Sequence, residues 1–314
     1  MRVLVTGGAG FIGSNLTFAL VGAGHEVGVV DDLSTGRIEN LHPAAWFRKL
    51  DILDGSFADV TAEFAPEAIV HLAAQPSVSA SIKDPERNHA VNVEGTRRVA
   101  RAALTARARR VVSASSAAVY GEPATLPLPE TAPKSPANPY GDSKLAAELV
   151  LIEELGATDV DFGSFRFSNV YGPRQDAFGE GGVVAIFAER MTSRTRVTID
   201  GDGRQTRDFI FVGDIVSAIA DALGTGERLA VEGIDSPAYN ISTGEEVSVL
   251  DLAGRMRAIT GYAEEFAHGP ARGGDVARSS LDPTKAREVF GWQAHTSLDA
   301  GLELTLAWFA TRTS

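Results

Sequence analysis

Residues 1–32 read MRVLVTGGAGFIGSNLTFALVGAGHEVGVVDD, and this stretch decides the fold. Its aliphatic run without polar alternation, residues 2–5, is typical of a strand buried on both faces of a parallel sheet. Gly7, Gly10 and Gly13 follow, and apolar residues then recur at helical intervals as far as the glycines at 22 and 24. The stretch therefore predicts a strand, a glycine turn and a helix in direct succession.

This succession favours a dinucleotide site over a plain connector, which a glycine pattern alone would also suit. A pyrophosphate can lie on the free N–H groups of a helix N-terminus only if no side chain holds it away. Residues 26–30 predict a second strand, which ends in Asp31, 18 residues after Gly13. A carboxylate there accepts ribose hydroxyls and repels a 2'-phosphate, so NAD is expected rather than NADP. Arg37 could hold a phosphate only if Asp31 turned away.

The composition limits the classes of protein to which the chain can belong. Its 314 residues are 44% hydrophobic, enough for a large core in one domain or in a domain with a smaller companion. With no cysteine, disulfides, thiolate zinc sites and a cysteine nucleophile are excluded. The net charge of -12 disfavours nucleic acid and anionic membranes as partners. No apolar run approaches about 18 residues and the chain starts directly with a strand, so we expect a cytoplasmic protein.

Three features of the next hundred residues bear on a nucleotide site. A third strand is expected over residues 47–50, and Asp51 and Ile52 at its end either reach the adenine or belong to an ordinary loop. Residues 67–74 predict a buried strand that runs into alanines, as a chain passing closely under a cofactor requires. His71 within this apolar run is interpreted as a satisfied core residue rather than a ligand.

A tyrosine and a lysine carry the candidate chemistry. Residues 109–112 predict a strand that ends in serines, Ser116 among them, and a proline-rich loop leads from there to a helix that contains Tyr140 and Lys144. A spacing of four places both side chains on one helix face. An ammonium beside a phenol favours the phenolate and lowers the pKa of that phenol, which makes it a usable base.

Together these motifs resemble the extended short-chain dehydrogenase/reductase family, and most of all its nucleotide-sugar 4-epimerases of the UDP-glucose 4-epimerase type. The resemblance covers nearly the whole chain. It rests on TGGAGFIG at 6–13, HLAA at 71–74, SASS at 113–116, YGDSK at 140–144, RFSNVYGPR at 166–174, QTRDF at 205–209 and RGGD at 272–275.

The resemblance implies a fold, a cofactor and partners. The fold would be α/β, a doubly wound parallel (Rossmann) sheet that binds NAD over residues 1–170, with a smaller C-terminal α/β lobe for the sugar nucleotide over 171–314. A strand near 238–243 would return to the larger lobe. Two long helices, about 86–106 and 140–155, would form the four-helix contact of a homodimer. The substrate would be a UDP-sugar, with no nucleic acid, membrane or metal involved.

The resemblance also implies roles for individual residues. Tyr140 would be the acid/base on the sugar 4-hydroxyl, Ser116 would hydrogen-bond that hydroxyl, and Lys144 would hold the nicotinamide ribose. The hydrogen at C4 would pass to NAD and return to the other face of a 4-keto sugar. The sugar nucleotide would contact Ser116, Asn169, Arg207, Arg272, Asp275 and Ser279. Residues implied at the cofactor are Gly7, Gly10, Phe11, Ile12, Gly13, Asp31, Asp32, Asp51, Ile52, Leu72, Ala73, Ala74, Gln75, Asn92, Tyr140, Lys144 and Phe167.

Two positions depart from the family pattern. Ala118 stands where many epimerases have a hydroxyl near the sugar, so one hydrogen bond is absent or is moved to Ser115 or to water. Ser168 stands where phenylalanine is usual, so looser packing against the nicotinamide is expected.

Other activities of the family remain as alternatives. Dehydratases place an Asp-Glu pair where this chain has Ala117 and Ala118, and decarboxylases place a glutamate at the second position, so elimination and decarboxylation lack their acid. A net dehydrogenase would accumulate reduced nicotinamide, and a cofactor-sensing module would lack the tyrosine and lysine. The sugar is not fixed by these motifs. Ser279 is small where glucose-restricted epimerases tend to carry tyrosine, so both UDP-glucose and UDP-N-acetylglucosamine are expected substrates.

Overall fold

The computed structural model describes residues 1–123, 125–177, 182–231, 233, 235–271 and 276–312. Within them, seven strands form one sheet in the order β11-β6-β5-β4-β1-β2-β3, and every neighbouring pair is parallel. The chain winds outward from β1 in both directions, so the predicted doubly wound sheet is confirmed. The strands are β1 (Arg2–Thr6), β2 (Glu26–Asp31), β3 (Trp46–Lys49), β4 (Ala68–His71), β5 (Arg110–Ser116), β6 (Asp161–Phe167) and β11 (Ala238–Ile241).

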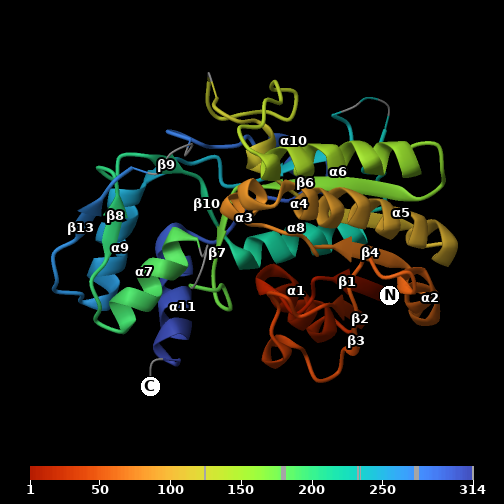
Figure 1. Ribbon diagram of the computed structural model, residues 1–314, viewed down its shortest axis with the longest axis horizontal. Coiled ribbons are helices and arrows are strands. Elements are labelled where there is room, and N and C mark those ends of the chain that lie inside the picture. The colour runs from red at the N-terminus through yellow and green to blue at the C-terminus, as the bar shows by residue number, and fades with distance from the viewer. Residues whose placement is uncertain (124, 178–181, 232, 234, 272–275, 313–314) are drawn as a thin grey trace.

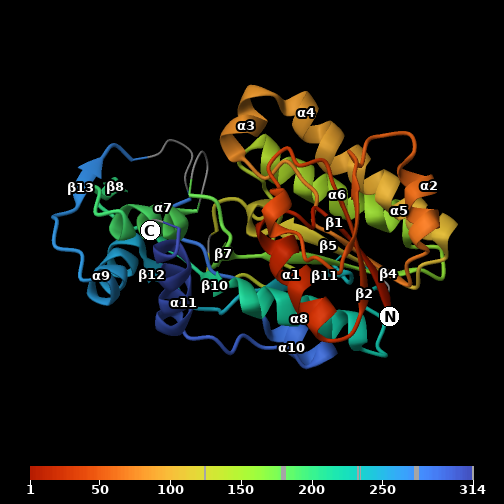
Figure 2. The same cartoon turned by 90° about the horizontal axis from the view of Figure 1, so that it is seen from below.

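Helices cover both faces of this sheet (Figures 1 and 2). On one face lie α1 (Phe11–Gly22), α8 (Val212–Gly224) and α10 (Thr284–Phe290). The other face carries α2 (Phe57–Phe64), α3 (Val78–Lys83), α4 (Pro85–His89), η2 (Ala90–Glu94), α5 (Gly95–Ala106) and α6 (Pro139–Leu155). The predicted helix over 86–106 is thus continuous helical chain, with a π-helical segment, η2, between α4 and α5.

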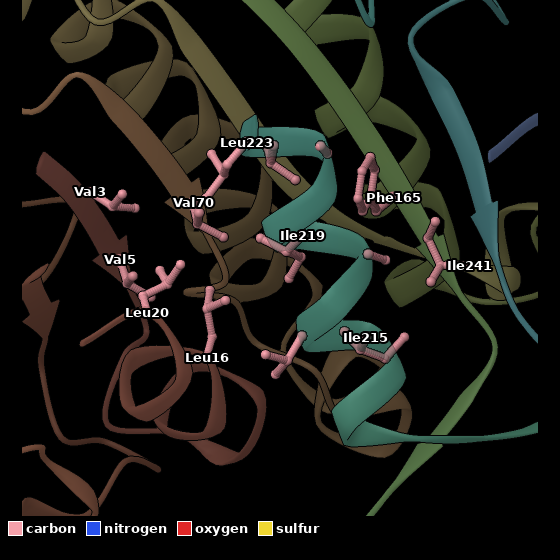
Figure 3. Close-up of a cluster of buried hydrophobic side chains, with 14 of the residues drawn as sticks. Val3, Val5, Leu16, Leu20, Val70, Phe165, Ile215, Ile219, Leu223 and Ile241 are labelled. Carbon is pink, nitrogen blue, oxygen red and sulfur yellow. The ribbon is translucent and has the colours of Figure 1, made fainter. Parts of the chain in front are cut away.

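The core follows from the alternation of side chains along the strands. Val3 and Val5 point to the α1 and α8 face, where they meet Leu16 and Ile219 in one buried cluster (Figure 3). Leu4, one residue along, joins the cluster under α5 and α6 on the opposite face. Burial of each such side chain stabilises the fold by about 1.5–3 kcal/mol. The continuous apolar run of β1 therefore reflects a strand that is packed on both sides.

A smaller lobe with its own core lies beside the sheet (Figure 1). Its helices are α7 (Val183–Thr192), α9 (Val249–Thr260) and α11 (Leu298–Ala310), and its short strands β8 (Thr198–Asp200) and β13 (Ala267–Gly269) pair in parallel. Four short strands lie in the chain segments that run between the two lobes. They are β7 (Asn169–Tyr171), β9 (Thr206–Arg207), β10 (Phe209–Phe211) and β12 (Val247–Ser248). Short 3-10 turns are η1 (Ile38–Asn40) and η3 (Ala117–Val119).

Two observed strands, β3 and β11, differ slightly from the predicted ranges. β3 begins and ends one residue before the predicted range 47–50. β11 ends at Ile241, because Ser242 and Thr243 leave the sheet and hydrogen-bond Leu281 and Asp208. Across the described residues, no helix has the length and apolar character that a membrane crossing demands.

Candidate active site

The glycine turn after β1 is packed so closely that side chains are excluded from it. Gly7 has a φ of +72°, and a Cβ there would lie 2.6 Å from the backbone nitrogen of Ala73. A Cβ on Gly13 would lie 2.2 Å from the carbonyl oxygen of Gly7. Gly10 is the N-cap of α1, so no side chain covers the first N–H groups of the helix. The first turn begins with Phe11 and Ile12 and contains no acidic residue. This bare helix N-terminus fits the pyrophosphate of a dinucleotide.

Asp31 is fixed beside this turn. Its side chain is buried, and it accepts hydrogen bonds from the Ala9 N–H at 2.9 Å and the Leu33 N–H at 2.8 Å. Burial raises the pKa of Asp31, while these two amides act in the opposite direction. Asp32 is more open and accepts from the amide and hydroxyl of Ser34 at 2.8 and 2.6 Å. Asp31 is therefore held beside the glycine turn, and its contact with a ribose stays a prediction.

Arg37 pairs with two carboxylates instead of standing free near that position. Its guanidinium lies 3.5 Å from Asp176 and 3.8 Å from Glu39. Together with the orientation of Asp31, these ion pairs leave the site better suited to ribose hydroxyls than to a 2'-phosphate.

The expected adenine side is formed by residues just after β3. Asp51 accepts from the Leu53 N–H at 2.8 Å and pairs with Arg87 of α4 at 3.2 Å. Ile52 is buried against Gly95, where a Cβ would lie only 2.4 Å from the Ile52 Cδ1. Asp51 thus links β3 to α4, and its contact with adenine stays a prediction.

Residues 72–75 leave β4 half-buried and are held by Asn92. The buried Asn92 amide accepts from the Gln75 N–H at 2.8 Å and donates to the Gln75 carbonyl at 3.1 Å and to the Ser143 hydroxyl at 2.9 Å. The segment Leu72, Ala73, Ala74 and Gln75 is therefore tied to α6. Both N–H groups of the Asn92 side chain thus bind protein groups, and the cofactor contact that the resemblance implied for Asn92 stays a prediction.

His71 is a buried core residue, as interpreted from the sequence. Its Nδ1 lies 2.7 Å from the Thr6 hydroxyl and its Nε2 lies 3.1 Å from the Thr96 hydroxyl. Burial, together with the charge of Lys144, lowers the pKa of His71 to about 3. The imidazole is therefore neutral at physiological pH and supplies no proton.

Tyr140, Lys144 and Ser116 converge at the carboxyl edge of the sheet. Asn138 caps α6 by accepting from the Gly141 N–H at 3.0 Å, which fixes the first helical turn. The Lys144 Nζ donates to the Ala114 carbonyl at 3.0 Å and lies 6.0 Å from the centre of the Tyr140 ring. Burial raises the pKa of Tyr140, and a hydrogen bond with Ser116 opposes that rise, so the lowered pKa predicted for this phenol from its spacing to Lys144 is not observed.

Sequence reasoning missed a buried ion pair one helical turn beyond Lys144. Glu148 is bound by Arg166 through two hydrogen bonds of 2.9 and 2.6 Å, and it accepts from Ser115 at 2.5 Å. Burial lowers the pKa of Lys144 to about 8, and the charge of Glu148 opposes that change. The spacing 140, 144, 148 on one helix face was the available signal. Ser115 is occupied here, so it does not replace the hydroxyl that Ala118 lacks.

The expected sugar-nucleotide residues come from separate segments. Asn169 is exposed at the start of β7, and Arg207 lies on β9. The Ser279 N–H donates to the Thr206 carbonyl at 3.2 Å, which places Ser279 alongside β9. Arg272 and Asp275 lie outside the described residues. The Phe167 side chain is buried in the core of the large lobe, and its contact with the cofactor stays a prediction.

The side-chain-free helix N-terminus after β1 and the group of Tyr140, Lys144 and Ser116 form a candidate dinucleotide-binding active site, in which the acid/base role of Tyr140 stays a prediction. The model of the NAD dependent epimerase/dehydratase family matches residues 3–242, and the chain belongs to this family, whose cofactor is NAD.

Similar proteins agree over the full length. The UDP-glucose 4-epimerase of Mycolicibacterium smegmatis is 44% identical over 99% of both chains. The structure of UDP-glucose 4-epimerase with UDP-glucose from Thermotoga maritima has a TM-score of 0.93 at 38% identity and covers 100% of both chains. A Thermus thermophilus UDP-glucose 4-epimerase complex with NAD has a TM-score of 0.90 at 38% identity, over 98% of this chain and 99% of its own.

Proposed function

We propose that the protein is an NAD-dependent nucleotide-sugar 4-epimerase that interconverts UDP-glucose and UDP-galactose. The observation that carries this proposal is the group formed by the half-buried Tyr140 and Ser116 and the buried Lys144 at the carboxyl end of the sheet. The full-length likeness to UDP-glucose 4-epimerases supports the choice of substrate.

In this proposal the protein moves one proton and holds the sugar. Ser116 donates to the 4-hydroxyl or its alkoxide, and Tyr140 takes the hydroxyl proton as C4 is oxidised and returns it afterwards. Lys144 stabilises the Tyr140 phenolate by its charge and binds the nicotinamide ribose. Bound NAD supplies the oxidant and then the reductant, so the overall reaction is redox-neutral. Glu148 keeps the buried Lys144 protonated.

The neighbouring residues 117 and 118 favour epimerisation over elimination. Both are alanines, and Ala118 contributes its N–H to the Ser116 hydroxyl at 3.2 Å. A dehydratase needs a second acid at this place, which neither side chain provides. UDP-glucuronate or another NDP-sugar is the alternative substrate, since the exposed Asn169 and the β9 segment do not select one sugar.

Ser279 supports a broader choice of sugar. It lies next to β9, which carries Arg207, and its small side chain leaves room for an acetamido group. UDP-N-acetylglucosamine is therefore a second proposed substrate.

A panel of UDP-sugars tests the activity. The purified protein is incubated with UDP-glucose, UDP-N-acetylglucosamine and UDP-glucuronate, and the 4-epimers are resolved by chromatography. We expect galacto products from the first two and no lasting reduced-nicotinamide absorbance. Lasting absorbance with an oxidised sugar would identify a dehydrogenase instead.

We also propose a homodimer in the cytoplasm. The layer of α3–α6 packs together and exposes large apolar side chains, with Ile82 62% and Leu149 44% accessible. Light scattering should give about twice the 33.1 kDa of one chain, and Leu149→Glu should lower that mass; an unchanged mass would place the contact elsewhere. The chain has no cysteine, so no disulfide favours an oxidising compartment over the cytoplasm. Cell fractionation tests the cytoplasmic location.

A further inference from the structure

Asp208 is a completely buried carboxylate between β9 and β10. It accepts from the Thr243 N–H at 3.0 Å, the Thr243 hydroxyl at 2.8 Å and the Gly244 N–H at 3.0 Å. Longer hydrogen bonds come from the Ser168 hydroxyl at 3.3 Å, the Leu281 N–H at 3.4 Å and the Ser280 hydroxyl at 3.5 Å. Within the described ranges no lysine or arginine forms an ion pair with it, so protein dipoles alone hold this charge.

The partners of Asp208 stand next in sequence to the proposed sugar-nucleotide residues. Ser168 precedes Asn169, Ser280 follows Ser279, and Asp208 itself follows Arg207. The backbones are joined as well, because the Asn169 N–H donates to the Asp208 carbonyl at 2.9 Å. Three segments from distant parts of the chain therefore meet at one carboxylate.

The chemistry of the partners explains why a carboxylate is present. Every group that faces its two oxygens is a donor, and an ionised carboxylate offers about four acceptor positions. An asparagine would turn two N–H groups toward other donors. Burial of the charge raises the pKa of Asp208, and the Thr243, Gly244 and Leu281 groups oppose that change. Burial of a charge costs free energy, so this carboxylate is retained for the arrangement of donors that it holds around it.

We propose that Asp208 is a positioning residue that sets Asn169, Arg207 and Ser279 in register around the uridine diphosphate part of the substrate. The proposal rests on the proposed function for the identity of the ligand. It also gives Ser168 a role, because the Ser168 hydroxyl donates to Asp208. Asp208 itself touches no substrate and acts through its neighbours.

Three substitutions in the full-length protein separate positioning from general stability. Asp208→Asn removes the charge, and Ser168→Ala removes one donor without placing a new polar group. Ser164→Ala is the control, because Ser164 lies on β6, the strand that ends one residue before Ser168, and its buried hydroxyl has no hydrogen-bond partner among the described groups. Binding of UDP is measured by calorimetry, with bound NAD and melting temperature determined on the same samples.

We expect UDP to bind about three- to tenfold more weakly to Ser168→Ala and at least about tenfold more weakly to Asp208→Asn, as the loss of hydrogen bonds to a charged group predicts. Bound NAD should match the wild type in both, and Ser164→Ala should match it in every measurement. Wild-type affinity for UDP in both variants would overturn the proposal. So would a loss of UDP affinity that only accompanies a loss of NAD and of melting temperature. If Asp208→Asn does not fold, Ser168→Ala decides.

UDP binding requires no turnover, so this experiment stays informative whatever the reaction is. A wild-type protein that binds UDP but produces no 4-epimer would refute the epimerase proposal and leave the test of Asp208 intact. A wild type that epimerises UDP-glucose while both variants bind UDP normally would refute only the role of Asp208.

Discussion

Replacement of Lys144 by methionine should abolish turnover and at the same time stabilise the folded protein. The Lys144 ammonium is buried, and its pKa falls from an ordinary 10.5 to about 8. Each pH unit of displacement corresponds to about 1.4 kcal/mol, so at neutral pH the charge costs the folded state about 3 kcal/mol. Methionine keeps the length and packing of the chain but loses the hydrogen bond to Ala114, worth about 1 kcal/mol. The net gain should be about 2 kcal/mol.

The direction in which stability changes with pH follows from the lowered pKa of Lys144. The folded-state pKa is lower than the unfolded one, so between about 8 and 10.5 the unfolded chain binds more protons and stability rises with pH. The wild type should therefore gain most of the missing stability by about pH 10, and the gap between wild type and Lys144→Met should narrow.

Urea unfolding of NAD-free protein at pH 7 and pH 10, followed by circular dichroism, measures the gap. NAD is removed first because a ligand that binds only the folded state adds to its stability. Lys83→Met, at an exposed position on α3, controls for loss of a surface lysine. The prediction is contradicted if Lys144→Met is less stable than wild type at pH 7, or if the difference in stability does not change with pH. Either result would show that burial of the ammonium does not destabilise the folded protein.

Three further substitutions or comparisons test the site. Tyr140→Phe should lower kcat by about 10²- to 10⁴-fold while NAD stays bound, since only the hydroxyl is lost; a rate near wild type would remove Tyr140 from its role. NAD should bind NAD-free protein more tightly than NADP because of Asp31, and equal affinities by calorimetry would contradict that. Ser279→Tyr should reduce kcat/KM for UDP-N-acetylglucosamine and spare UDP-glucose, whereas an unchanged ratio would place Ser279 outside the pocket.

The fold and the cofactor could be predicted because their signals are local. The glycine turn, the helix after it and the acid at the end of β2 all lie within residues 1–32. Each parallel strand is a short apolar run because helices cover both faces of the sheet. Tyr140 and Lys144 were found for the same reason, since four residues of one helix place them together.

The supporting network could not be read from the sequence. Ser115, Glu148 and Arg166 are brought together from β5, α6 and β6 only by the sheet order. Asp208 collects donors from segments up to 73 residues away, and none of them is unusual in isolation. The clamp of Asn92 on Gln75 and Ser143 likewise depends on the packing of η2 against α6, and the expected contact of Asn92 with the cofactor stays a prediction.

Deuterium at C4 of the substrate tests the central claim most directly. UDP-glucose that carries deuterium at C4 is incubated with the holoenzyme in ordinary water, and the UDP-galactose formed is analysed by mass spectrometry and NMR. Oxidation and reduction of C4 within one site predict a product that retains the deuterium at C4, with no lasting reduced-nicotinamide absorbance. UDP-galactose with hydrogen from water at C4 would contradict the account, because the inversion would then proceed by proton exchange with solvent.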